Sequence, residues 1–187
     1  MNRFVAISGC SGGGKSTLLK DLARRGHHVV EEPGRRIVLE ELEQGGTALP
    51  WVDAPAFARR AIELSIVDLR AATSALDWVF FDRGLVDAAA ALQHLTNEPA
   101  LSDLNCSSCY NRNVFLAPPW HEIYETDSQR RHSFSTAAAE YDRLEAVYPS
   151  LGYSVHILPK VPVRERADYV ITALDHQQNE TFTQMQS

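Results

Sequence analysis

The chain has 187 residues, enough for one α/β domain with a sizeable core and too few for two ordinary domains. Hydrophobic residues make up 44% and charged residues 22%, values close to the globular average that argue against a disordered or fibrous chain. The formal net charge of -6 argues against general affinity for nucleic acid or anionic membranes. An anionic ligand therefore needs a local basic site.

The apolar runs and the cysteine count bear on the cellular compartment of the protein. No apolar run approaches the roughly 18 residues of a membrane helix, and the apolar run at residues 4–7 is too short for a signal peptide. Three cysteines, an odd number, do not make a disulfide framework and suit a reducing compartment. We expect a cytoplasmic protein without a membrane partner, and the sequence predicts no oligomeric state.

The first half of the chain alternates short apolar strands with helical patterns. Residues 4–7 predict a buried strand, and the glycine-rich stretch at 9–14 predicts a loop. A helix that ends near Gly26 should follow this loop. A second strand at 28–31 precedes a helix that ends near residues 45–46. Asp53 is the expected N-cap of a long helix that runs to about Leu76, and a nearly all-apolar strand follows at 78–81.

The second half continues the alternation. Residues 85–95 predict a helix, residues 114–116 and 155–158 predict two strands, and apolar stripes at 141–151 and 163–174 predict two more helices. Five strands alternating with helices indicate a doubly wound parallel sheet that binds ligands at the carboxyl ends of its strands. We expect one domain over residues 1–175, with a lid region at about 121–134 and a fraying polar tail at 176–187.

The strongest motif in the chain is a phosphate-binding loop. Residues 9–16 read Gly-Cys-Ser-Gly-Gly-Gly-Lys-Ser and match the G-x-x-x-x-G-K-[ST] pattern in its strand-loop-helix context. The backbone amides of such a loop surround the β-phosphate, Lys15 bridges the β- and γ-phosphates, and Ser16 ligates magnesium. The expected nucleotide-binding residues are Gly9, Ser11, Gly12, Gly13, Gly14, Lys15, Ser16 and Thr17.

Asp82 and Arg83 follow the third strand. An aspartate there holds the magnesium shell in P-loop proteins, so Ser16 and Asp82 are the expected metal ligands. The alternative is that Asp82 only caps the next helix. Arg83 stands where hydrolytic ATPases of the AAA+ class place a glutamate, and it is expected to bind a phosphate on the acceptor or on ATP.

The second strand ends at another charged corner, Glu31-Glu32-Pro33-Gly34-Arg35. Glu32 is the expected general base for an attacking hydroxyl, and Arg35 is expected to orient the acceptor with Arg83. The alternative is a solvated loop with an Arg36–Glu40 helix pair.

Two further stretches carry reactive or charged side chains. Arg130 and Arg131 are candidate lid arginines that close over the transferred phosphoryl group, or else they belong to an ordinary charged helix end. Cys106 and Cys109 form a C-x-x-C without a second pair, which is a weak signal for metal or redox chemistry.

Taken together, the P-loop, residues 32–35, residues 81–84, the lid region at 124–131 and residues 158–166 resemble a known family. The chain is similar to the small bacterial predicted ATPases grouped as an "AAA domain", which are related to the ribosylnicotinamide kinase domain and more distantly to nucleoside and nucleotide kinases. The resemblance implies binding of ATP with Mg²⁺ and a central P-loop strand in the order 2-3-1-4-5.

The sequence thus predicts a kinase that transfers the γ-phosphoryl group of Mg-ATP to a small, nucleoside-like hydroxyl acceptor. Lys15, Glu32, Asp82, Arg83, Arg130 and Arg131 are its expected catalytic residues. The alternatives are an ATPase or nucleotide-dependent switch that acts on a macromolecule, and a nucleotide-binding module without catalysis. The acceptor itself is not encoded in any motif.

Overall fold

The computed structural model describes residues 2–74, 77–124 and 133–184. Within them, five parallel strands form one sheet in the order β2-β3-β1-β4-β5. The strands are β1 (Phe4–Gly9), β2 (His28–Val30), β3 (Val79–Asp82), β4 (Asn113–Ala117) and β5 (Ser154–Ile157). The predicted doubly wound parallel sheet and its strand order are confirmed.

Helices connect these strands. They are α1 (Lys15–Arg24), α2 (Pro33–Gln44), α3 (Ala54–Ala71), α4 (Leu85–Thr96), α5 (Ala100–Asp103), α6 (Phe134–Ser150) and α7 (Val163–Gln184). Asp53 caps α3 as expected, because its side chain accepts a hydrogen bond from the Ala56 amide at 2.9 Å. The short α5 was not predicted, and the expected end of α3 near Leu76 lies outside the described residues. The last helix was expected to end near Leu174 but continues to Gln184.

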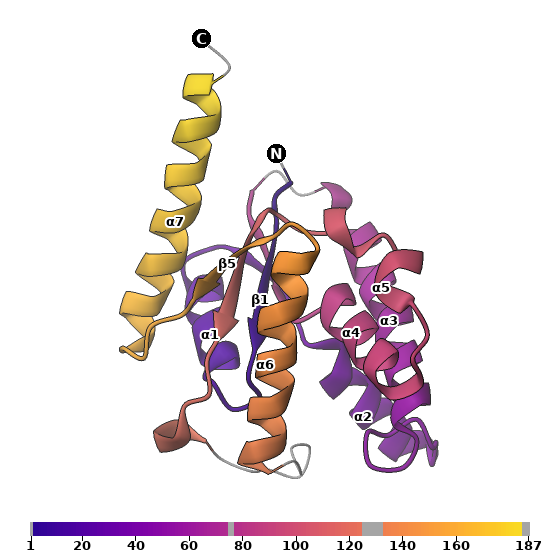
Figure 1. Ribbon diagram of the computed structural model, residues 1–187. Coiled ribbons are helices and arrows are strands. Elements are labelled where there is room, and N and C mark those ends of the chain that lie inside the picture. Colours follow the sequence, from indigo (N-terminus) through magenta and orange to yellow (C-terminus); the bar gives the residue numbers. More distant parts are fainter. Residues whose placement is uncertain (1, 75–76, 125–132, 185–187) are drawn as a thin grey trace.

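The two faces of the sheet are covered by different helices, as Figure 1 shows. Side chains alternate along β1, so Val5 and Ile7 pack in one cluster with residues of α1 and α7, whereas Ala6 packs in the other with residues of α2, α3, α4 and α6. This alternation explains why both faces of the central strand are buried.

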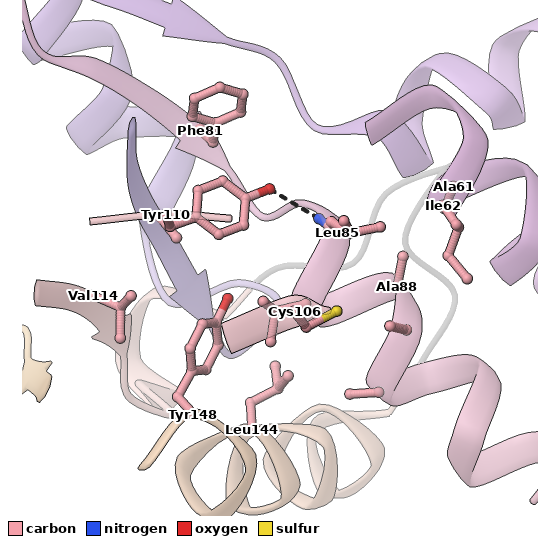
Figure 2. Packing of buried hydrophobic residues seen from close by; sticks show 14 of the residues in the cluster. Ala61, Ile62, Phe81, Leu85, Ala88, Cys106, Tyr110, Val114, Leu144 and Tyr148 are labelled. Atoms are coloured by element: carbon pink, nitrogen blue, oxygen red, sulfur yellow. Dashed lines mark hydrogen bonds between the residues drawn. The ribbon is translucent and has the colours of Figure 1, made fainter. Parts of the chain in front are cut away.

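Figure 2 shows the core beneath α4 and α6. Leu144 and Tyr148 of α6 are buried in this cluster with Tyr110 and Leu85. The Tyr110 hydroxyl accepts a hydrogen bond from the Leu85 amide at 2.9 Å and so satisfies one of the first N–H groups of α4. The core therefore fixes the start of α4, directly after Arg83.

The register of the sheet brings the expected site residues together. Ile7 of β1 is paired with Asp82 of β3, and Gly9 is paired with Ala117 of β4. The Arg83 amide then donates to the Ile7 carbonyl at 3.0 Å. As a result, the P-loop, the Glu32 corner and the Asp82–Arg83 turn leave the sheet at the same edge.

Candidate functional site

Two glycines of the P-loop have positive φ values and close neighbours that leave no room for a Cβ. Gly9 has a φ of +102°, and a Cβ there would overlap the Ala117 carbonyl oxygen. Gly14, with a φ of +79°, is the N-cap of α1, and a Cβ on it would lie 2.6 Å from the Arg166 Nη1. No side-chain cap bonds to the first amides of α1, so they remain able to bind an anion.

Lys15 lies against this loop. Its side chain is buried, and its Nζ donates to the Cys10 carbonyl at 3.0 Å and to the Gly9 carbonyl at 3.5 Å. Burial lowers the pKa of Lys15 from its ordinary value and the Arg83 guanidinium lowers it further, although the Asp82 carboxylate opposes this. The ammonium is thus held beside the loop by carbonyls, where a phosphate oxygen would improve its solvation.

Ser16 and Asp82 form a pair of oxygen donors that fits a divalent cation. The Ser16 Oγ donates to the Asp82 Oδ2 at 3.4 Å. The Asp82 Oδ1 is buried and has no hydrogen-bond partner among the residues that the structure describes. Burial, and then the Glu32 carboxylate, raise the pKa of Asp82 to about 6. Magnesium prefers carboxylate and hydroxyl oxygens, and an orphaned carboxylate oxygen is a suitable ligand for it. Asp82 is not a helix cap, because Gly84 is the N-cap of α4.

Arg83 is the centre of a buried ion cluster. Its Nη1 and Nη2 bind the two Glu140 carboxylate oxygens at 2.9 and 3.1 Å, and Nη2 also donates to the Gly9 carbonyl at 3.0 Å. Its Nε lies 3.3 Å from the Glu32 Oε1, and its Nη1 lies 3.4 Å from the Asp87 Oδ1. Burial by itself lowers the pKa of Arg83, but these carboxylates outweigh burial and raise it. A phosphate that binds Arg83 must therefore replace at least one carboxylate.

The Glu32 corner joins this cluster. Glu32 is the N-cap of α2, and its Oε2 accepts from the Arg35 Nε at 3.1 Å while its Oε1 lies beside Arg83. The alternative Arg36–Glu40 pair is not the observed arrangement. Arg36 instead binds both carboxylate oxygens of Asp68, at 2.9 and 2.8 Å.

Two carboxylates of the cluster were missed by sequence reasoning. Asp87 is buried in the first turn of α4, where it accepts hydrogen bonds from the Ser8 hydroxyl and, at 2.8 Å, from the Tyr148 hydroxyl. Burial raises the pKa of Asp87, although Arg83 and the two hydroxyls oppose this. The available signal was one acidic residue in an otherwise apolar helical segment, four positions after Arg83. Glu140 gave no such signal, because its helix carries other acidic residues.

Arg166 of α7 is a third residue without a role predicted from sequence. It is 3% exposed, and its Nη2 and Nη1 donate to the Gly13 and Gly14 carbonyls at 3.1 and 3.3 Å. Its guanidinium carbon lies 5.7 Å from the centre of the Trp120 ring, which is cation–π range. Arg166 therefore supports the outer turn of the P-loop from the far end of the chain.

Two cavities meet at this edge of the sheet. One, of about 710 Å³, is lined by Lys15, Ser16 and Thr17 and extends past Trp120 to Arg166. The other, of about 480 Å³, lies among α2, α3, α4 and α6 and has a largely apolar lining that includes Val38 and Phe57. The residues that line both are Ser11, Glu32 and Arg35. The two cavities therefore share one boundary, which these three residues form.

The remaining predicted features have a mixed outcome. The candidate lid residues Arg130 and Arg131 lie outside the described residues. Cys106 is buried and Cys109 is partly exposed, and no group of three or more His, Cys, Asp or Glu residues suited to a metal ion occurs in residues 2–74, 77–124 and 133–184. No helix in this part of the chain is long and apolar enough to cross a membrane.

The structure is similar to several solved kinases at low sequence identity. A deoxyadenosine kinase from M. mycoides, solved with the products dCMP and dCDP, has a TM-score of 0.65 and 14% identity over 92% of this chain and 99% of that one. A thymidylate kinase from Ehrlichia chaffeensis has a TM-score of 0.59 and 16% identity over 92% and 97% of the two chains. A shikimate kinase from Acinetobacter baumannii, in complex with shikimate, has a TM-score of 0.54 and 16% identity over 95% of each chain.

At these identities the three neighbours establish the fold and leave the activity open. No curated protein matches the chain. A family model described as "AAA domain", however, matches residues 4–166, which is most of the chain and includes the P-loop, the Glu32 corner and the Asp82–Arg83 turn. The chain therefore belongs to this AAA-domain family and has the P-loop nucleotide-binding fold of nucleoside, shikimate and thymidylate kinases.

Proposed function

We propose that the protein is a kinase that transfers the γ-phosphoryl group of Mg-ATP to a hydroxyl group of a small molecule. The observation that carries this proposal is the boundary between the two cavities, where Glu32 lines both the P-loop cavity and the apolar cavity. An enzyme that only hydrolyses ATP needs a site for water and has no use for a second cavity of about 480 Å³. The kinase neighbours, which act on small molecules, support the same reading.

In this reaction the P-loop amides and Lys15 bind the β- and γ-phosphates. Ser16 and Asp82 hold Mg²⁺, which neutralises charge on the phosphates. Glu32 accepts the proton of the attacking hydroxyl, because its carboxylate lies at the shared boundary of the two cavities. Arg35, which binds Glu32, and Arg83 orient the acceptor and stabilise charge on the transferred group.

The lid proposal is kept for Arg130 and Arg131, which are candidates for contacts with the transferred phosphoryl group. The cytoplasm, which the sequence predicts as the compartment, supplies the Mg-ATP that the reaction consumes. An acceptor that has the size of a nucleoside is compatible with the second cavity.

The proposal is tested by measuring ADP release from Mg-ATP with a panel of nucleosides, hydroxy acids and sugars. We expect at least one acceptor to raise the rate above the rate with water. Glu32→Gln should lower kcat with that acceptor by about 100-fold or more while ADP binding persists. The matched control is Glu31→Gln, which changes the adjacent exposed carboxylate and should leave kcat unchanged.

Two further variants separate binding from chemistry. Lys15→Ala should weaken nucleotide binding, whereas Asp82→Asn should abolish turnover and preserve ADP binding. A rate that no small molecule changes but that a macromolecular partner raises would instead support the ATPase or switch function. Binding of Mg-ATP without turnover under any condition would support a nucleotide-binding module.

A further inference from the structure

The charged residues that line the apolar cavity are three arginines and three carboxylates, and their pairing leaves one arginine without a carboxylate partner among the described residues. Among its charged lining residues, Arg83 contacts Glu32, Asp87 and Glu140, and Arg35 contacts Glu32. The sixth charged residue in the lining is Arg143 of α6. Within the described residues it forms no ion pair, and its Nε is buried without a hydrogen-bond partner.

Arg143 is placed away from the site of phosphoryl transfer. Arg143 follows Glu140 by three residues on α6, so its backbone lies about 4.5 Å beyond that of Glu140 along the helix axis, toward the C-terminus of α6. Glu140 itself is bound to Arg83 at the end of the cavity that faces the P-loop. Burial raises the pKa of Glu140, but Arg83 and, to smaller extents, Lys15 and then Arg143 hold it below its ordinary value. The positive field of Arg143 thus reaches into the cavity.

Much of the rest of the cavity lining is apolar. Phe57 and Ala61 of α3 and Ala88 and Ala91 of α4 line the cavity. An unpaired guanidinium beside such walls is less well solvated than in water, and an anion placed there gains more from it than in water. Arginine is also suited to binding an anion there, because its planar guanidinium group can donate hydrogen bonds to two oxygens of a carboxylate or phosphate.

We propose that Arg143 binds an anionic group of the acceptor, a carboxylate or a phosphate ester, which the body of the acceptor separates from the hydroxyl that receives the phosphoryl group. This inference rests on the proposed kinase function, because it assigns the chemistry of the second substrate. The acceptor is then a hydroxylated carboxylate or a hydroxylated phosphate ester. A neutral alcohol or nucleoside of the same size is a poorer ligand.

The test is a binding experiment that needs no turnover. Isothermal titration calorimetry with saturating Mg-ADP compares matched probes: shikimate with its methyl ester for a carboxylate, and ribose 5-phosphate with ribose for a phosphate ester. We expect the anionic member of at least one pair to bind about tenfold or more tightly than its neutral partner, and the responsive pair identifies the anion.

Arg143→Gln should weaken binding of that anionic probe by about 10- to 100-fold and leave the neutral probe unchanged. Arg143→Lys keeps the positive charge and should bind the anionic probe more tightly than Arg143→Gln does. This variant keeps the proposal testable if Arg143→Gln folds poorly. Arg24→Gln is the matched control, because the Arg24 side chain is 76% exposed and lies on α1, outside the cavity. The proposal is overturned if neither pair shows a charge preference, or if Arg143→Gln weakens both members of a pair equally.

ADP release from Mg-ATP in the same samples tests the kinase function separately. Charge-selective binding that is lost in Arg143→Gln, without acceptor-dependent ADP release, supports the anion site and contradicts the kinase reaction. Turnover of neutral acceptors alone contradicts the anion site and supports the kinase reaction.

Discussion

The Arg83 cluster makes a sharp prediction for stability. Arg83→Gln removes the cation that faces Glu140, Glu32 and Asp87, whose side chains are 32%, 23% and 6% exposed. Loss of one partner from a buried ion pair costs about 3–5 kcal/mol. Since solvent screens Glu140 and Glu32 in part, we expect Arg83→Gln to lower the free energy of unfolding by about 3 kcal/mol, the lower end of this range. For a domain of this size, that corresponds to a decrease in Tm of roughly 6–12 °C.

Urea unfolding followed by circular dichroism measures this loss. Glutamine is as strained as arginine at a φ of +61°, so the backbone contribution should cancel. The control is Arg59→Gln, which removes an exposed ion pair with Glu98 and should cost less than about 1 kcal/mol. Adding Glu140→Gln to Arg83→Gln should restore part of the stability. If Arg83→Gln is no more destabilising than Arg59→Gln, Arg83 does not hold this cluster together.

Three further outcomes follow from the described contacts. Gly9→Ala should destabilise the protein by more than Gly26→Ala in urea unfolding. Both glycines have positive φ, so an alanine at either position should lower the free energy of unfolding by about 1–3 kcal/mol through backbone strain. Of the two, only Gly9 has neighbouring backbone that a Cβ would also overlap. Tyr110→Phe should cost about 1–3 kcal/mol in the same assay, because it leaves a buried amide of α4 without its acceptor. Cys109 should react with iodoacetamide before Cys106 at neutral pH in a mass-spectrometric time course. Interaction with the Cys106 thiol lowers the pKa of Cys109, whereas that interaction and burial raise the pKa of Cys106; equal alkylation rates would contradict this order.

The parts of the fold that were predicted correctly depend on local signals. Apolar β-branched runs and helical periodicity identified the strands and most helices, and the P-loop motif carried its own strand-loop-helix context. Glu32, Asp82 and Arg83 could be expected near one another because all three follow parallel strands, whose carboxyl ends meet at one edge. The predicted clustering thus followed from topology alone.

What was missed depends on how helices are rotated against the sheet. Asp87 and Glu140 reach Arg83 from α4 and α6, and Arg166 reaches the P-loop from α7. A helical pattern shows which residues share a face, but it does not show what that face contacts. The predicted role of Arg83 as a phosphate ligand stays a prediction, and the carboxylates that surround Arg83 mean that a phosphate must displace one of them. The length of α7 was underestimated because its last part lacks an apolar stripe.

The contact between Arg166 and the P-loop has a consequence for the order in which the protein is made. The Gly13 carbonyl and the Arg166 guanidinium are separated by 153 positions in the sequence. The segment between these two residues must be synthesised before this bond can form, although the P-loop motif itself emerges earlier. A chain interrupted after β4 would contain the complete nucleotide-binding motif without this support. Nucleotide affinity should therefore appear late during synthesis, when α7 docks on α1.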